Sequence, residues 1–270
     1  MTADLASAAL KGAGIATRLR RSRSGMIYGR RGSGVPVVLV HGWCLDRTVW
    51  MYLEESLVGE GYEVISPALA GYGASADLAG PYTLARHAAD LADLLEDLDL
   101  EGALLVGFAY GAAALLELPR FARVAGMALV GVPSAAGAPY PKMRRAMLRD
   151  WPLFAQRSAR AICHVQHSEA TFAWLGGVFA ATPLECALAG VDELAEFEPD
   201  RPQRWDVPTV FVHGSQDAIV SVDVSRDCVA RYEDAELVEV PDCGHFVPLD
   251  QQAALLAAIV RLAGRAGGTS

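Results

Sequence analysis

Asp217 and His245 are the residues best suited to acid–base chemistry, and they occur in two short loops. Asp217 ends the segment 212–217 (Val-His-Gly-Ser-Gln-Asp), and His245 lies in the segment 241–246 (Pro-Asp-Cys-Gly-His-Phe). A histidine exchanges protons near neutral pH, and a carboxylate can orient its ring and stabilise the charged form. Both loops follow apolar runs typical of buried strands. We therefore expect both side chains at the edge of one sheet where its strands end.

A third segment, Gly107-Phe108-Ala109-Tyr110-Gly111, follows a buried strand and opens a helix. It resembles the nucleophile elbow of the α/β-hydrolase family, Gly-x-Ser-x-Gly, with Ala109 in the place of the serine. Glycines suit both flanking positions because side chains there would collide across the sharp turn. The order of elbow, acid and histidine along the chain is also that of this family. The resemblance implies that His245 is the general base and then acid, that Asp217 holds its ring, and that Ala109 occupies the nucleophile position.

The segment His41-Gly42-Trp43 ends the first predicted parallel strand. In the resembled family this loop and the residue after the nucleophile form the oxyanion hole, which implies the backbone N–H groups of Trp43 and Tyr110. Each such donor contributes roughly 3–4 kcal/mol to a hydrolytic transition state. We expect His41 to stabilise its loop and His213 to pack at a strand end.

Ala109 carries a methyl group where acyl transfer requires an oxygen. No neighbour replaces it, since Cys44 is expected to be a small buried residue. Loss of a triad serine lowers turnover by a factor on the order of 10⁶, whereas substrate binding survives. Two origins stay open. Either alanine was introduced in place of the serine of an ordinary hydrolase to trap its substrate, which the completeness of the other groups favours, or the natural protein works with His245 and Asp217 alone or without catalysis.

Strands and helices alternate along most of the chain, which predicts an α/β fold with a mostly parallel sheet and helices on both faces. Residues 135–204 show only helical patterns and predict a helical cap over the strand ends; residues 1–134 and 205–270 form the core. An edge hairpin is expected within residues 17–28, followed by a loop at 30–34. The predicted strands are 37–40, 62–66, 103–106, 127–132, 209–212 and 237–240, and the predicted helices are 46–59, 83–98, 111–118, 142–163, 170–180, 183–197 and 251–262.

Aromatic residues near the loops and in the cap could give an apolar pocket for an aromatic or acyl-chain substrate. His164 and His167 lie three residues apart on a predicted helix and lack a third ligand at suitable spacing, so we expect no metal site. An acidic run at 192–200 is expected to be solvated. The candidate pocket residues are Trp43, Phe108, Trp151, Phe154, Phe172, Trp174 and Phe246.

The composition limits the classes of protein. The chain has 270 residues, a net charge of −9 and 52% hydrophobic residues, which excludes a disordered chain and argues against nucleic-acid or anionic membrane surfaces. No run approaches the roughly 18–20 uncharged residues of a membrane span. Residues 1–16 lack the order of a signal peptide, and five scattered cysteines suit a reducing compartment. We expect a cytoplasmic protein without a cofactor that binds a small hydrophobic molecule, and a homodimer is left open.

Three functions follow from these observations. The first is hydrolysis of a small hydrophobic ester, lactone or thioester through an acyl-enzyme. The second is a cofactor-free lyase, cyclase or oxygenase that uses only the His245–Asp217 pair. The segment His41-Gly42-Trp43-Cys44 is similar to that of cofactor-independent quinolone ring-opening dioxygenases. The third is a non-catalytic ligand-binding protein on the same fold.

Overall fold

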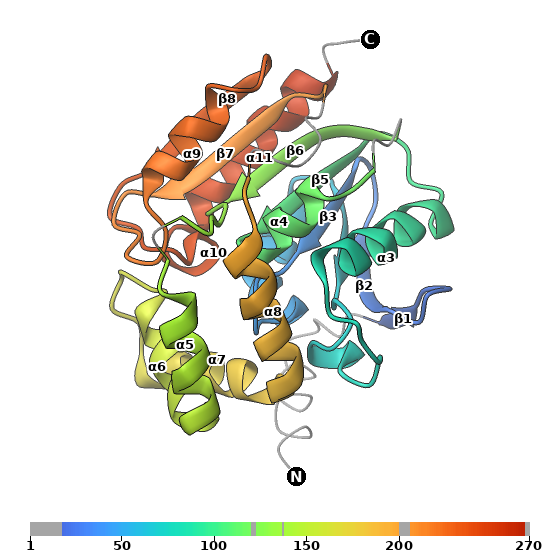
Figure 1. Cartoon of the computed structure of the whole chain (residues 1–270). Helices are drawn as coiled ribbons and strands as arrows, with labels where there is room; N and C mark the ends of the chain where they lie inside the picture. Colours follow the sequence, from blue (N-terminus) through green and yellow to red (C-terminus); the bar gives the residue numbers. More distant parts are fainter. Residues whose placement is uncertain (1–17, 120–122, 137, 200–205, 268–270) are drawn as a thin grey trace.

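A twisted sheet forms the centre of the computed structural model, which describes residues 18–119, 123–136, 138–199 and 206–267 (Figure 1). Within these residues the sheet has eight strands in the order β1-β2-β4-β3-β5-β6-β7-β8. The β1–β2 and β2–β4 pairs are antiparallel, and every other neighbouring pair is parallel. The predicted α/β class with a mostly parallel sheet is thus confirmed. The strands are β1 Leu19–Arg21, β2 Ile27–Gly32, β3 Pro36–Val40, β4 Glu63–Pro67, β5 Ala103–Phe108, β6 Val124–Val130, β7 Thr209–Gly214 and β8 Ala235–Val240.

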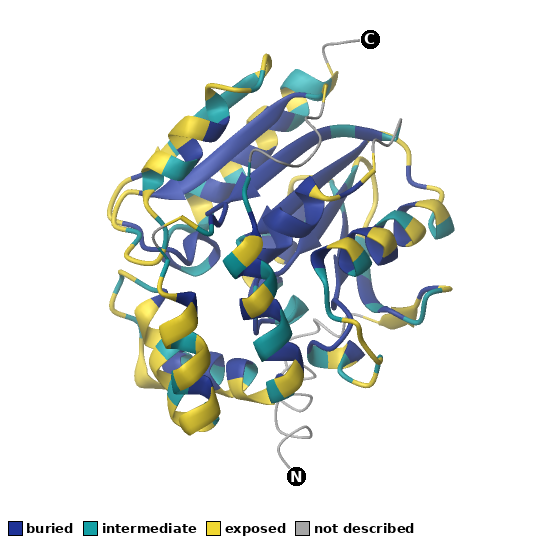
Figure 2. Cartoon of the chain, viewed as in Figure 1, coloured by how far each residue is buried: buried dark blue, intermediate teal, exposed yellow. Residues whose placement is uncertain are grey.

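Helices cover both faces of the sheet, and the central strands are buried on both sides (Figure 2). The helices α2 and α11 pack together on one face, whereas α3 and α4 pack together on the other (Figure 1). Thr83 caps α3 by accepting a hydrogen bond from the Arg86 N–H. These elements are η1 Arg47–Trp50, α2 Met51–Gly59, η2 Gly73–Ser75, α3 Leu84–Asp97, α4 Tyr110–Leu116, α9 Val222–Val229, α10 Val247–Asp250 and α11 Gln252–Gly267.

Four further helices, here called the insertion helices, occupy the sequence between β6 and β7. They are α5 Tyr140–Arg149, α6 Trp151–Ala161, α7 Glu169–Ala181 and α8 Leu184–Glu196. The expected continuous helix over 142–163 is wrong, because Asp150 leaves the helical conformation and its side chain caps α6 at Leu153 N–H. Pro152, which has no N–H, fits the first turn of a new helix and would disrupt a continuous one. The predicted boundary between cap and core at 204–205 lies outside the described residues.

Two other expectations about the elements differ from the structure. The expected loop at 30–34 is wrong for residues 30–32, because β2 continues to Gly32 and pairs with β4. Arg30 forms an ion pair of 2.7 Å with Glu63 on β4, so charged residues conceal this strand in the sequence. The helix α9 has a mixed polar composition and no prediction covered it.

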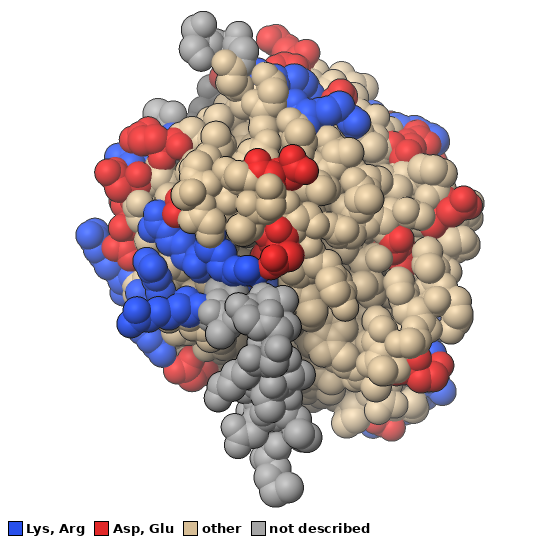
Figure 3. Space-filling view, turned by 180° about the vertical axis from the view of Figure 1, so that it is seen from behind, with Lys and Arg blue, Asp and Glu red and all other residues tan. Residues whose placement is uncertain are grey.

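Charged side chains are mostly paired across neighbouring elements. Figure 3 shows basic and acidic side chains close to one another on the rear face. Arg31 contacts Glu55 at 2.8 Å, and Arg226 contacts Glu239 at the same distance. Within the predicted acidic run, Glu193 accepts a hydrogen bond from the Leu84 N–H, so this carboxylate binds the start of α3 instead of being solvated. Asp200 lies outside the described residues.

None of the described helices alone has the length and apolar composition needed to span a bilayer. By those two criteria alone, only the bent pair α7 and α8, with 90° between them, would qualify.

Substitution of Gly111 tests the close packing of α4 against β3. A Cβ atom there would lie 2.4 Å from the Val40 carbonyl oxygen and 2.5 Å from that of His41. Because these atoms belong to the sheet and its loop, Gly111→Ala should lower the free energy of unfolding by about 2–3 kcal/mol in urea denaturation.

The matched control is Gly264→Ala, on an exposed part of α11 with no atom within 4 Å of the added Cβ. Better helix propensity should raise its stability by about 0.5–1 kcal/mol. Equal stabilities of Gly111→Ala and the unchanged chain would contradict the packing described here.

Candidate active site

The turn from β5 to α4 holds Ala109 in a conformation that alanine seldom adopts. Its φ and ψ angles are 48° and −109°. Hydrogen bonds fix both sides of the turn, since Ala109 N–H donates to Val130 and its carbonyl accepts from the Ala113 N–H. A Cβ at Gly107 would lie 2.7 Å from the Ala112 backbone, which explains the flanking glycines together with Gly111. The Gly-x-x-x-Gly segment therefore forms the sharp bend that its sequence predicts.

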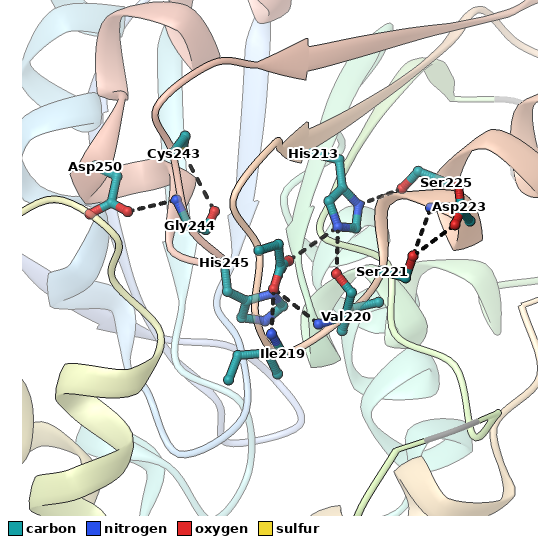
Figure 4. Close-up of polar contacts among 11 residues, drawn as sticks. His213, Ile219, Val220, Ser221, Asp223, Ser225, Cys243, Gly244, His245 and Asp250 are labelled. Carbon is teal, nitrogen blue, oxygen red and sulfur yellow. Dashed lines mark hydrogen bonds and ion pairs between the residues drawn. The ribbon is translucent and has the colours of Figure 1, made fainter.

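His245 and Asp217 meet although they follow different strands, β8 and β7. The His245 Nδ1 lies 2.7 Å from the Asp217 Oδ2 (Figure 4). The other carboxylate oxygen accepts backbone N–H groups from Ile219 at 2.8 Å and Val220 at 2.9 Å. Burial alone would raise the pKa of Asp217, but the charge of His245 and the surrounding hydrogen bonds hold it well below its usual range. A charged carboxylate only accepts, so Nδ1 carries the hydrogen and Nε2 is left to take up a proton.

His213 is a member of this network that sequence reasoning missed. Its Nε2 lies 3.1 Å from the Asp217 Oδ2 and 3.0 Å from the Val220 carbonyl, and its Nδ1 lies 2.8 Å from the Ser225 Oγ (Figure 4). The predicted packing role at a strand end is therefore incomplete, because this buried ring also supports the carboxylate that holds His245. The spacing of four residues between His213 and Asp217 around a tight loop is the one signal that could have revealed it.

The backbone on both sides of His245 is bonded to the insertion helices or to Asp250. Gly244 N–H donates to the Asp250 Oδ2 at 2.9 Å, and Phe246 N–H donates to the Ile162 carbonyl at 2.8 Å. The same Asp250 oxygen accepts the His164 N–H at 2.7 Å. The end of α6 and the loop after it therefore determine where His245 lies.

His164 and His167 lie in the loop between α6 and α7, so the prediction that they share a helix is wrong. The structure brings possible metal ligands from Cys163, His167 and Asp250 within 4.8 Å of one another. The Asp250 Oδ1 already lies 2.8 Å from the His167 Nε2, and Oδ2 accepts two backbone N–H groups. Burial, followed by the charge of Asp250, raises the pKa of Cys163 to about 12, which keeps the thiol protonated. Hydrogen bonding alone thus accounts for this cluster.

A cavity of about 390 Å³ lies between the insertion helices and the loops that follow the strands. Of the candidate catalytic residues, Ala109 and His245 line it, and Asp217 lies behind His245. Of the predicted pocket residues, Trp43, Phe108 and Phe154 line it. The remaining lining residues are Leu45, Tyr110, Pro133, Ala138, Pro139, Tyr140, Met143, Arg157, Ser158, Ala161, Ile162, Phe179, Leu194, Ala218, Ile219 and Val220.

Four predicted pocket residues lie elsewhere among the described residues. Phe246 packs on Phe108 beneath the cavity, with ring centroids 5.4 Å apart. Trp151 stacks on Phe154 at 6.1 Å, and Phe172 lies under the Arg160 guanidinium. Trp174 packs against the hydrophobic core on α7. None of these four residues lines this cavity. For Trp151, Phe172 and Trp174, helical spacing predicts a buried face but not the neighbour that this face contacts.

Trp43 and Tyr110 both line the cavity. Their backbone N–H groups donate to no acceptor within residues 18–119, 123–136, 138–199 and 206–267. The Trp43 side chain donates to the Ala187 carbonyl at 2.9 Å and packs edge-on against Phe154 and Phe179. The loop that carries Trp43 is therefore fixed against three insertion helices.

His41 and Cys44 occupy the roles that the sequence predicts. His41 Nδ1 lies 2.9 Å from the Gly42 carbonyl, and its Nε2 accepts the Leu69 N–H at 3.0 Å, which joins two loops. Cys44 is fully buried, and burial raises the pKa of its thiol well above the usual value. Neither residue supplies a nucleophile.

His87 is buried behind the bend, between Tyr72 and Tyr110. The ring centroids are 6.0 Å and 5.6 Å from those of the two tyrosines. Neither ring nitrogen has a hydrogen-bond partner among the described residues. Burial, assisted by the charges of His41 and Arg86, lowers the pKa of His87 to about 3. The neutral ring is therefore part of the native packing.

Comparisons with known proteins support the fold described above. The model of the family described as "Alpha/beta hydrolase family" matches residues 37–259. A putative non-heme chloroperoxidase of Synechocystis sp. is 26% identical over 82% of this chain and 88% of its own length. An esterase of Exiguobacterium antarcticum has a TM-score of 0.84 at 19% identity, covering 92% of this chain and 99% of its own. An enol-lactonase of Burkholderia xenovorans has a TM-score of 0.79 at 18% identity, covering 92% and 100%. The two structural likenesses show the fold alone.

His87 should make the folded protein sensitive to acid. Its folded pKa of about 3 lies below the ordinary 6.5, so between these values the unfolded chain binds a proton that the folded chain does not. Stability is therefore lost as pH falls from 6.5 towards 3, by about 2–3 kcal/mol at pH 4.5 from this residue.

The variant His87→Phe should remove that loss. The readout is the difference between the unfolding free energies at pH 7 and pH 4.5, in which a constant packing cost cancels. His164→Gln, at an exposed ring, is the control and should behave like the unchanged chain. If His87→Phe keeps the full pH dependence, the assigned pKa is wrong.

Proposed function

The chain belongs to the alpha/beta hydrolase family, and on this basis we propose that its cavity binds a small hydrophobic ester, lactone or thioester next to Ala109. The observation that carries the proposal is the shared cavity. Ala109 at the strained bend, His245, Trp43 and Tyr110 all line it, and the backbone N–H groups of Trp43 and Tyr110 have no acceptor among the described residues. The lining is otherwise largely apolar, which suits an acyl or aromatic substrate.

With a serine at position 109, these groups would perform acyl transfer. His245 Nε2 would take the hydroxyl proton as the oxygen attacks the carbonyl carbon, and the Trp43 and Tyr110 N–H groups would stabilise the resulting oxyanion. His245 would then give the proton to the leaving group, and Asp217 would stabilise the imidazolium between these steps. Water would hydrolyse the acyl-enzyme by the same sequence.

The methyl group of Ala109 cannot attack a carbonyl, so this chain forms no acyl-enzyme at that position. The donors, the base and the cavity do not depend on the missing oxygen. Binding should therefore survive while covalent turnover is lost. We propose that the chain, as it stands, holds such a substrate intact.

A second candidate function rests on the intact acid–base network in a chain without a nucleophile. Asp217 is buried, charged and hydrogen-bonded by His213, His245 and two backbone N–H groups. This arrangement suits His245 Nε2 to remove a proton from a bound substrate without a covalent step, as in a cofactor-free lyase, cyclase or oxygenase. A non-catalytic binding protein has no use for such a base.

Restoring the oxygen tests the first proposal. Ala109→Ser should hydrolyse short p-nitrophenyl esters at least about 10³-fold faster than the unchanged chain, with a burst of p-nitrophenol and an acyl adduct in the intact mass. Ala109→Gly, which offers no oxygen at the same bend, is the matched control. The double variant Ala109→Ser/His245→Ala should lose the gain.

If Ala109→Ser forms no adduct with any short ester, lactone or thioester, the acyl-enzyme proposal is wrong. Turnover by the unchanged chain that disappears in His245→Ala would instead support the second candidate. Ligand binding that persists in His245→Ala, with no turnover by either protein, would support the binding protein.

A further inference from the structure

One face of α6 forms a wall of the cavity. Phe154, Arg157, Ser158 and Ala161 all line it, and their spacing of three, four and seven residues places them on one side of a helix. Arg157 therefore lies on the stripe of α6 that faces the cavity. It is the one permanently charged side chain among the described residues that line this space.

Arg157 has no acidic partner among the described residues. Two other arginines of the insertion helices do: Arg160 pairs with Glu169, and Arg144 lies 3.0 Å from Asp192. As far as the structure describes the chain, the lining contains no aspartate or glutamate. A guanidinium stays charged throughout the physiological pH range and offers five N–H donors, two of which match the spacing of carboxylate or phosphate oxygens. Arg157 lines the cavity and is also exposed to solvent, so its donors are accessible to an anion that binds at this wall.

The remaining wall is largely apolar, with Phe154, Phe179 and Leu194 among its members. A ligand that fits both parts has an apolar body and one anionic end. The net charge of −9 disfavours anions over most of the surface, so a local cation is needed to select one.

We propose that the cavity selects an amphiphilic anion, whose carboxylate or phosphate binds Arg157 while its acyl or aromatic body fills the apolar space. This inference rests on the proposed function only in one respect, the position of a reactive carbonyl beside Ala109. Binding of the anionic end requires neither a nucleophile nor turnover.

Calorimetric titration of the unchanged chain tests this selection with three probes of equal chain length, octanoate, octyl phosphate and neutral octanamide. The better of the two anions should bind at least about fivefold more tightly than octanamide, and added salt should reduce the difference. Whichever anion binds more tightly identifies the headgroup, carboxylate or phosphate.

Arg157→Gln should bring the affinity for the anion down to that for octanamide and leave octanamide binding unchanged. Arg157→Lys keeps the charge and should retain part of the preference. Arg149→Gln, which removes an exposed arginine at the end of α5 outside the cavity, is the matched control and should retain all of it. Thermal unfolding of each variant confirms that it is folded.

Equal affinity of the unchanged chain for octanamide and both anions would overturn the inference. So would equal losses in Arg157→Gln and Arg149→Gln, or the absence of saturable anion binding. The proposed function and this inference can fail separately. If Ala109→Ser hydrolyses neutral esters but the cavity does not prefer anions, only this inference is rejected. Arg157-dependent anion binding without any acyl adduct rejects the ester function alone.

Discussion

The site depends on the sharp bend at Ala109. A non-glycine residue in this part of backbone space costs about 1–3 kcal/mol, and such strain persists only where the surroundings enforce it. Here β5, β6 and α4 enforce it through hydrogen bonds, and the close approach of Gly111 to β3 leaves no room for relaxation. The bend directs residue 109 into the cavity that His245 also lines. The strain thus remains in a chain whose residue 109 has no reactive atom.

A second network supports the histidine that also lines this cavity. His213 and two backbone N–H groups fix the Asp217 carboxylate, which in turn fixes the His245 ring. Asp250 binds the loop that carries His245 to the insertion helices. Core and insertion therefore both contribute to the position of the base, although the sequence separates them widely.

The sequence predicts the parallel sheet, the order of its segments and the meeting of Asp217 with His245, because each depends on local patterns whose geometry is fixed. Strand ends converge, and the Gly-x-x-x-Gly bend follows from sterics. The contacts of Trp151 and Trp174 could not be predicted, since helical periodicity does not name the partner of a buried face. His213 resembled a packing residue because its hydrogen bonds arise only when the loop after β7 folds back. The same limit concealed Arg157, whose spacing has meaning only once Phe154 and Ala161 are known to face a cavity.

The anchoring of α6 beside His245 has a consequence for how a molecule reaches the cavity. Since Gly244 and Phe246 are bonded to Asp250 and Ile162, the C-terminal end of α6 cannot swing outward without pulling the imidazole off its carboxylate. Ile219 and Val220 also bond the Asp217 carboxylate, so movements that admit a ligand belong to the part of the wall formed by Ala138, Pro139, Tyr140 and Met143. The cavity can then open at this part of its wall while the His245 ring stays aligned with the Asp217 carboxylate.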